Sequence, residues 1–190
     1  ALLEVLRRPV PKWLTWTGIV SAFCVAAYTG FLLGVVSAYP LWNNAILPVL
    51  FVVSALSAGL AATSLVGLIP DRERFEQMWL IKKSHVILSA IEMVVLATML
   101  IIVSSGSPEG AASVASLVSG QYAPMFWGGL VLLGLVAPFA IEGYPVFVTR
   151  KVETSTTSMV VSVIGEGGVL VGGFMLRLLV ILAALPVLYL

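Results

Sequence analysis

The chain has 190 residues, of which 60% are hydrophobic and only 10% are charged, and its mean hydropathy is +1.10. A soluble domain is typically about 25% charged, so this composition excludes an ordinary globular protein and indicates an integral membrane protein. The net charge of +1 provides no basic surface for nucleic acid, and one cysteine and one histidine cannot by themselves hold an iron–sulfur cluster, a zinc ion or a bis-histidine haem.

Five apolar runs are long enough to cross a bilayer, whose hydrocarbon core needs about 20 residues of helix. These spans are expected at 17–38, 45–69, 84–103, 124–148 and 158–185. Because backbone hydrogen bonds must be satisfied within each segment at membrane depth, all five are predicted to be helices. The sequence therefore predicts an all-α integral membrane protein, with residues 1–190 forming a single transmembrane bundle. Since the chain begins with Ala1 and not with Met, we expect it to be part of a longer subunit.

The basic residues are confined to alternate connections between these spans. One side of the membrane receives Arg7, Arg8, Lys12, Arg72, Arg74, Lys82, Lys83, Arg150 and Lys151. The connections at 39–44 and 104–123 contain no Lys or Arg, and the second of them is expected to include a short surface helix. By the positive-inside rule, this distribution predicts a cytoplasmic N-terminus and a C-terminus outside, with Trp13 and Trp16 at the membrane interface.

Ionisable side chains inside the spans are the main candidates for function, because each costs roughly 2.5–3.5 kcal/mol at the centre of a membrane helix. The candidates are His85, Glu92, Glu142, Glu166 and Arg177. His85, Ser89 and Glu92 recur at i, i+4 and i+7, which places them on one face of the third span. Glu166 and Arg177 also share a face, but their separation of 11 residues is too long for a direct ion pair at about 1.5 Å per residue.

Two interpretations of these residues remain open. They form a proton path through the bundle interior, with His85 near its entrance, or they hold the helices together through interhelical hydrogen bonds. The glycines of the last span, including Gly168-x-x-x-Gly172, are explained by close helix packing. They do not form a phosphate loop, because no strand precedes them and no Gly-Lys-Ser/Thr follows. Pro138 and Pro145 are expected to disturb the fourth span.

Four short motifs follow one another along the chain. They are Tyr-Thr-Gly at 28–30, Pro-Leu-Trp-Asn at 40–43, Leu-Ser-Ala-Gly at 56–59 and Gly-Gly-x-x-x-Arg at 172–177. In this order the motifs resemble the NrfD-like family, the polysulfide-reductase type of membrane subunit. The resemblance implies that the chain is the C-terminal five helices of a core with eight or more spans.

The resemblance also implies a function, namely a quinone-interacting anchor of a respiratory oxidoreductase. Such a subunit exchanges electrons between membrane quinone (menaquinone or ubiquinone) and a peripheral iron–sulfur subunit, often paired with a molybdenum enzyme, in a bacterial or archaeal cytoplasmic membrane. It carries no haem or iron–sulfur cluster and has no catalytic residue of its own. Tyr28, expected to be buried in the first span, matches the quinone-contacting tyrosine. Trp42, Asn43 and Asn44 would dock the iron–sulfur subunit, and the buried acids and Arg177 would belong to the proton path.

Other functions fit the residues when they are taken alone. Buried Tyr28 needs a hydrogen-bond partner, which is either a quinone carbonyl or a neighbouring helix. Trp42, Asn43 and Asn44 are also explained by an aromatic belt followed by a turn. The main alternative function is an ion- or proton-coupled transporter, in which the buried charges bind the substrate. A purely structural membrane anchor is the third.

Overall fold

The computed structural model describes residues 11–68, 78–144, 146–147 and 156–186. Within these ranges every regular element is a helix, in the order α2 (Lys12–Gly34), α3 (Ile46–Leu68), α4 (Met78–Gly106), α5 (Pro108–Val118), η2 (Met125–Val136), α6 (Ala137–Tyr144) and α7 (Thr156–Leu182). Five segments of the described part are long and apolar enough to cross a membrane, at 12–34, 46–66, 82–106, 125–144 and 159–182. The predicted all-α membrane fold with five spans is therefore confirmed.

Part of the charge pattern falls on the parts of the chain that the structure leaves out. The basic residues outside the described ranges are Arg7, Arg8, Arg72, Arg74, Arg150 and Lys151. Pro145, a predicted kink position, also lies outside them. The orientation of the protein across the membrane remains a prediction from the positive-inside rule.

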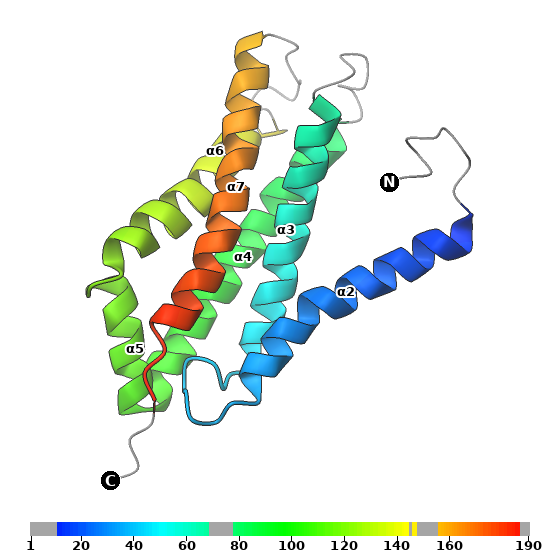
Figure 1. Cartoon of the computed structure of the whole chain (residues 1–190). Coiled ribbons are helices and arrows are strands. Elements are labelled where there is room, and N and C mark those ends of the chain that lie inside the picture. The colour runs from blue at the N-terminus through cyan, green and yellow to red at the C-terminus, as the bar shows by residue number, and fades with distance from the viewer. Residues whose placement is uncertain (1–10, 69–77, 145, 148–155, 187–190) are drawn as a thin grey trace.

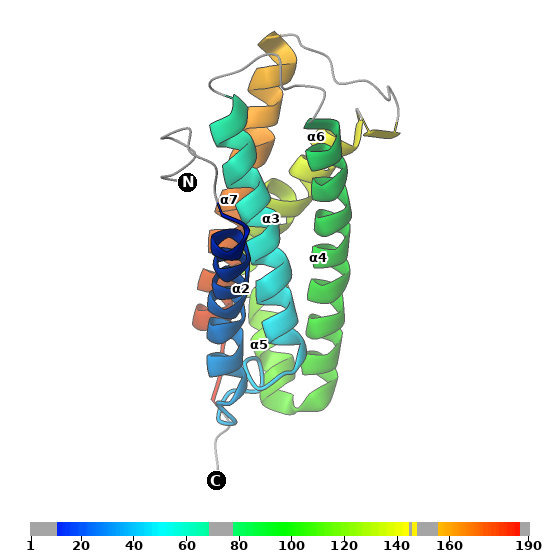
Figure 2. The ribbon, with the colours of Figure 1, turned by 90° about the vertical axis from the view of Figure 1, so that its right-hand side faces the viewer.

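Four of the spans pack side by side as a bundle, formed by α3, α4, α7 and the continuous helix η2–α6 (Figure 1 and Figure 2). The end of α3 and the starts of α4 and α7 lie at one end of this bundle, while the α2–α3 connection and α5 lie at the other. The short helix α5 confirms the expected surface helix within 104–123. The Ser107 hydroxyl caps its first turn by accepting a hydrogen bond of 3.0 Å from the Gly110 N–H.

The first span, α2, leans away from the bundle, and the gap widens toward its N-terminal end (Figure 1). Its main contact is with α3, where the backbone of Gly30 lies so close to Pro48 that a Cβ on residue 30 would clash. Ala27 and Gly30 are the buried residues of this helix. The expectation that Tyr28 is buried is wrong, because this side chain lies on the outward face and is 61% exposed.

Glycines set the contact between η2 and α7. Gly134 and Gly172 touch through their backbones, and a Cβ on either glycine would clash with the other. A Cβ on Gly168 would likewise meet the carbonyl oxygen of Leu133. The interpretation of Gly168 and Gly172 as packing residues is therefore confirmed. The fourth span changes from π-helix to α-helix at Ala137, directly before Pro138, whose ring nitrogen cannot donate to a preceding carbonyl.

Candidate functional site

Buried polar side chains line the bundle interior at the end where α3 finishes and α4 and α7 begin. They come from four helices and are Ser54, Ser57, Ser64, Lys82, His85, Ser89, Glu92, Glu142, Ser162 and Glu166. We call this region the polar half. The predicted face of α4 is confirmed, because His85, Ser89 and Glu92 all point inward and are each less than 5% exposed. A carboxylate, an imidazole and an ammonium group are thus gathered where hydrocarbon surrounds the protein, an arrangement that usually marks a functional path.

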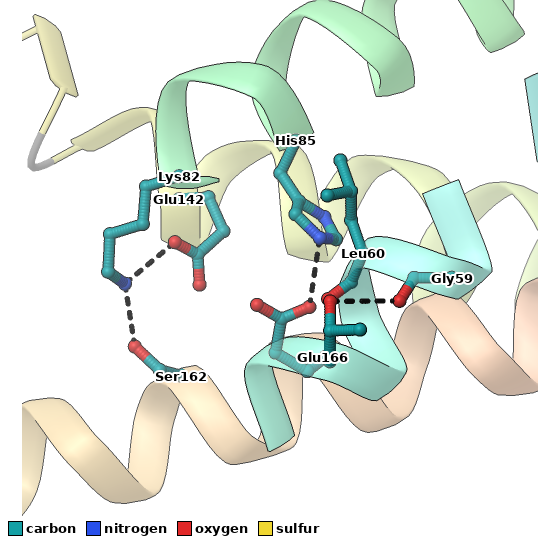
Figure 3. Close-up of polar contacts among 8 residues, drawn as sticks. Gly59, Leu60, Lys82, His85, Glu142, Ser162 and Glu166 are labelled. Atoms are coloured by element: carbon teal, nitrogen blue, oxygen red, sulfur yellow. Dashed lines mark hydrogen bonds and ion pairs between the residues drawn. The ribbon is translucent and has the colours of Figure 1, made fainter. Parts of the chain in front are cut away.

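Lys82 belongs to this group although its sequence position indicated a charged loop. Its ammonium group donates hydrogen bonds to Glu142 Oε2 at 2.7 Å and to Ser162 Oγ at 2.8 Å, so that it joins α4 to α6 and α7 (Figure 3). The expected loop position is wrong, because α4 begins at Met78 and Lys82 lies inside the bundle, 5% exposed. A helical signal was present, because Lys82 precedes His85 by three residues and extends the same face.

His85 and Glu166 form the second contact of the polar half. His85 Nε2 lies 3.4 Å from Glu166 Oε2, and the Leu60 backbone is close to the same imidazole (Figure 3). Glu142 Oε1 has no hydrogen-bond partner, and the His85–Glu166 contact is at ion-pair distance without the alignment of a hydrogen bond. Buried polar groups of this kind are normally satisfied by an ordered water molecule or an ion. The structure therefore gathers His85, Glu142 and Glu166 in one buried cluster, and proton transfer among them stays a prediction.

Glu92 and Arg177 lie deeper in the bundle and form a separate group. The Ser54 hydroxyl lies beside the Glu92 carboxyl, and Arg177 is within electrostatic reach of Glu92. Arg177 Nη1 donates to the Gly173 carbonyl oxygen at 2.6 Å, and its guanidinium carbon lies 5.6 Å from the centre of the Phe51 ring. The structure thus divides the five predicted residues into His85, Glu142 and Glu166 near the bundle end and Glu92 with Arg177 near mid-depth. As predicted, Glu166 does not pair with Arg177.

The residues predicted to dock a partner have intramolecular roles in two of three cases. Trp42 Nε1 donates to the Val180 carbonyl oxygen at 2.7 Å, which ties the α2–α3 connection to the end of α7. Asn44 Oδ1 accepts a hydrogen bond of 2.9 Å from the Ile46 N–H at the start of α3. Asn43 is exposed and, with Asn44, lines an open cavity of about 350 Å³ at this end of the bundle. The three residues remain a proposed docking site.

The described residues form no metal site, and the other two candidate reactive side chains, Cys24 and Tyr28, lie outside the polar half. Among the described residues, no three His, Cys, Asp or Glu side chains lie close enough together to hold a metal ion. Cys24 is exposed on α2, away from the polar half. Tyr28 lies on the outward face of the same helix, so the structure does not bring it into contact with the proposed proton path.

Comparison with known proteins gives matches along almost the whole sequence. The model of the family described as "Polysulphide reductase, NrfD" matches residues 1–188. Protein NrfD of Escherichia coli is 30% identical over 182 residues, which are 94% of this chain and 54% of that protein. One of the polysulfide reductase chains of Wolinella succinogenes is 32% identical over 128 residues, 65% of this chain and 40% of that protein. Protein NrfD homolog of Haemophilus influenzae is 28% identical over 166 residues, 86% of this chain and 50% of that protein.

The chain spans about half the length of the curated relatives that it matches. No solved structure is a significant match.

Proposed function

We propose that this chain, which belongs to the polysulphide reductase NrfD family, is the quinone-interacting part of a respiratory oxidoreductase in a bacterial or archaeal cytoplasmic membrane. It would pass electrons between membrane quinone and a peripheral iron–sulfur subunit that pairs with a molybdenum-type catalytic subunit. Family membership and five membrane-spanning helices support the coarser part of this proposal, a multi-pass membrane subunit of a redox complex.

The observation that carries the proposal is the polar half of the bundle. Quinone reduction takes up protons and quinol oxidation releases them, so a quinone-linked subunit at membrane depth needs groups that move protons. The Lys82–Glu142 and His85–Glu166 contacts supply such groups near one bundle end, and Glu92 supplies another toward mid-depth.

Beyond mid-depth the described bundle interior contains no comparable path. The core there is built from apolar side chains: Leu41, Leu47, Leu50, Phe51, Leu96, Met99, Val103, Leu117, Phe126, Leu130, Leu176, Leu179 and Val180. We call this region the apolar half. Because the apolar half offers no groups to carry protons, we infer that the proton path opens at the bundle end nearest Lys82 and stops near Arg177. Protons would then enter and leave from one side of the membrane.

Tyr28 is the proposed quinone contact. Its exposed position on α2, within a span, leaves the hydroxyl available to donate a hydrogen bond to a quinone carbonyl. We expect Tyr28→Phe to lower quinone-linked turnover of the assembled complex while activity with an artificial electron carrier and subunit composition stay unchanged. The matched control is Tyr144→Phe, since Tyr144 is also 61% exposed but lies on α6. Quinone kinetics that respond equally to both substitutions would remove Tyr28 from the site.

The alternative function, an ion- or proton-coupled transporter, is favoured by the same buried charges. Purification distinguishes the two functions. Recovery of an iron–sulfur subunit with the chain supports the redox role, whereas recovery without a redox partner, together with substrate uptake by vesicles, supports transport.

A further inference from the structure

The Lys82 ammonium group lies among oxygen atoms in the part of the polar half nearest the bundle end. Two of them accept its hydrogen bonds, Glu142 Oε2 at 2.7 Å and Ser162 Oγ at 2.8 Å. The second carboxylate oxygen of Glu142 is buried without a hydrogen-bond partner. The Glu166 carboxylate is within electrostatic reach of Glu142, although its Oε2 lies 3.4 Å from His85 Nε2. Figure 3 shows the Glu142 carboxylate turned toward Lys82 and the Glu166 carboxylate turned toward His85.

Carboxylate and hydroxyl oxygens are the ligands that hard metal cations prefer. The printed partners of Lys82 are one carboxylate oxygen and one hydroxyl oxygen, and among the described residues no three His, Cys, Asp or Glu side chains gather to hold a metal ion. An ammonium group carries one positive charge and three N–H donors, and it can therefore satisfy such oxygens itself. Lys82 places this charge on a side chain that is 5% exposed.

We infer that Lys82 is a tethered cation that fills an oxygen-lined cation site between α4, α6 and α7, and that it thereby determines the ion specificity of the polar half. While the ammonium group occupies the site, a sodium ion has no position beside Glu142, whereas protons still pass along the carboxylates and His85. Without the ammonium group, Glu142 and Ser162 present a buried, negatively charged pocket that takes up Na⁺.

A purely structural ion pair has a different consequence. Removing one partner of such a pair leaves an unpaired buried charge and destabilises the bundle whatever salt is present. If Lys82 instead fills a cation site, Na⁺ can bind in the emptied site and stabilise the protein, whereas a larger organic cation cannot. The stability of the variant then depends on which cation is present.

The inference deepens the proposed proton path and rests on it for its physiological meaning. The test of the inference does not depend on the proposed proton path, because Na⁺ binding is measured without quinone turnover. If Na⁺ binding follows the inference but quinone activity is absent, the redox proposal fails alone; if quinone activity is present without the expected Na⁺ binding, this inference fails alone.

The test compares Lys82→Met with the wild type in the assembled complex in lipid nanodiscs. Binding of ²²Na⁺ and the thermal midpoint in NaCl against choline chloride are measured. We expect Lys82→Met to bind Na⁺ about tenfold or more tightly than the wild type and to be stabilised by NaCl alone. Lys83→Met is the matched control, because it removes the neighbouring lysine, whose side chain is exposed, and it is expected to behave like the wild type.

Three further variants complete the test. Lys82→Arg keeps a cation in the site and should continue to exclude Na⁺, while Lys82→Met with Glu142→Gln should lose the binding that Lys82→Met gained. Lys82→Gln is measured in parallel in case the Met variant does not assemble, since its amide can still donate to Glu142. The inference is overturned if neither neutral variant responds specifically to Na⁺, or if the wild type binds Na⁺ as tightly as they do.

Discussion

The two halves of the bundle interior are built from the same helices but by opposite means. α4 contributes Lys82 and His85 to the polar half and Met99 and Val103 to the apolar half. α7 similarly contributes Glu166 to the first and Leu179 to the second. The difference therefore does not come from which helices line the interior, but from a change of residue type along each inward face near mid-depth.

This change matters because a membrane gives little drive for helices to associate through apolar contact alone. In the apolar half the helices are held by close packing and by a few hydrogen bonds to backbone carbonyls. In the polar half they are held by charges that would be costly if left unpaired. The polar half is thus expected to be sensitive to single substitutions and the apolar half to be more tolerant.

The largest expected effect comes from breaking the buried ion pair. Glu142→Leu leaves the Lys82 ammonium group in the bundle without its carboxylate, which should destabilise the protein by about 3–5 kcal/mol. Combining it with Lys82→Met should recover most of that loss, because no unpaired charge remains. Both are measured by reversible unfolding in mixed micelles. A double variant no more stable than Glu142→Leu would show that the pair is not what links these helices.

A cavity in the apolar half should cost less. Leu176→Ala removes a side chain that is 1% exposed, but the transfer contribution that operates in soluble proteins is largely absent in lipid, leaving the lost packing. We expect a loss of about 1–3 kcal/mol, measured by the same unfolding assay, with quinone-linked activity retained. Leu132→Ala, whose side chain faces outward, is the control and should change little. A loss from Leu176→Ala equal to that from Glu142→Leu would remove the contrast between the halves.

The smallest effect is expected at the far end of the apolar half. Trp42→Phe deletes the hydrogen bond of 2.7 Å to the Val180 carbonyl oxygen and should cost about 1 kcal/mol of stability. Trp127→Phe deletes a bond of 2.9 Å to the Val118 carbonyl oxygen, but this bond is exposed and joins residues only nine positions apart, so the cost should be smaller still. The comparison also tests docking: if Trp42→Phe detaches a partner subunit without lowering stability, Trp42 serves the interface and not the fold.

The sequence predicted most of this fold but only part of the site. Hydropathy located five spans because the length of an apolar run is fixed by bilayer thickness. It could not show how α2 leans, because this helix is apolar on all sides and carries no stripe that marks a buried face. The burial of Tyr28 was therefore mispredicted, and its true exposure follows from the contact of Gly30 with Pro48.

Within the site, spacing along one helix was informative and pairing between helices was not. The inward face of α4 could be read from His85, Ser89 and Glu92. That Lys82 meets Glu142 and Ser162 depends on how α4, α6 and α7 align, which no local pattern records. The lysine was also hidden by its neighbours, since it lies near the end of the most charged stretch of the sequence, residues 70–83, which was interpreted as a loop.

The most direct test of a proton path through the polar half is turnover-linked proton uptake by the complex in oriented proteoliposomes, comparing the wild type with Glu166→Gln. We predict that Glu166→Gln abolishes proton uptake from the side nearest Lys82 while artificial-carrier activity remains. Glu109→Gln, on α5 outside the polar half, is predicted to leave uptake unchanged. Normal uptake in Glu166→Gln, or uptake in the wild type from the side of the apolar half, would contradict a proton path through the polar half.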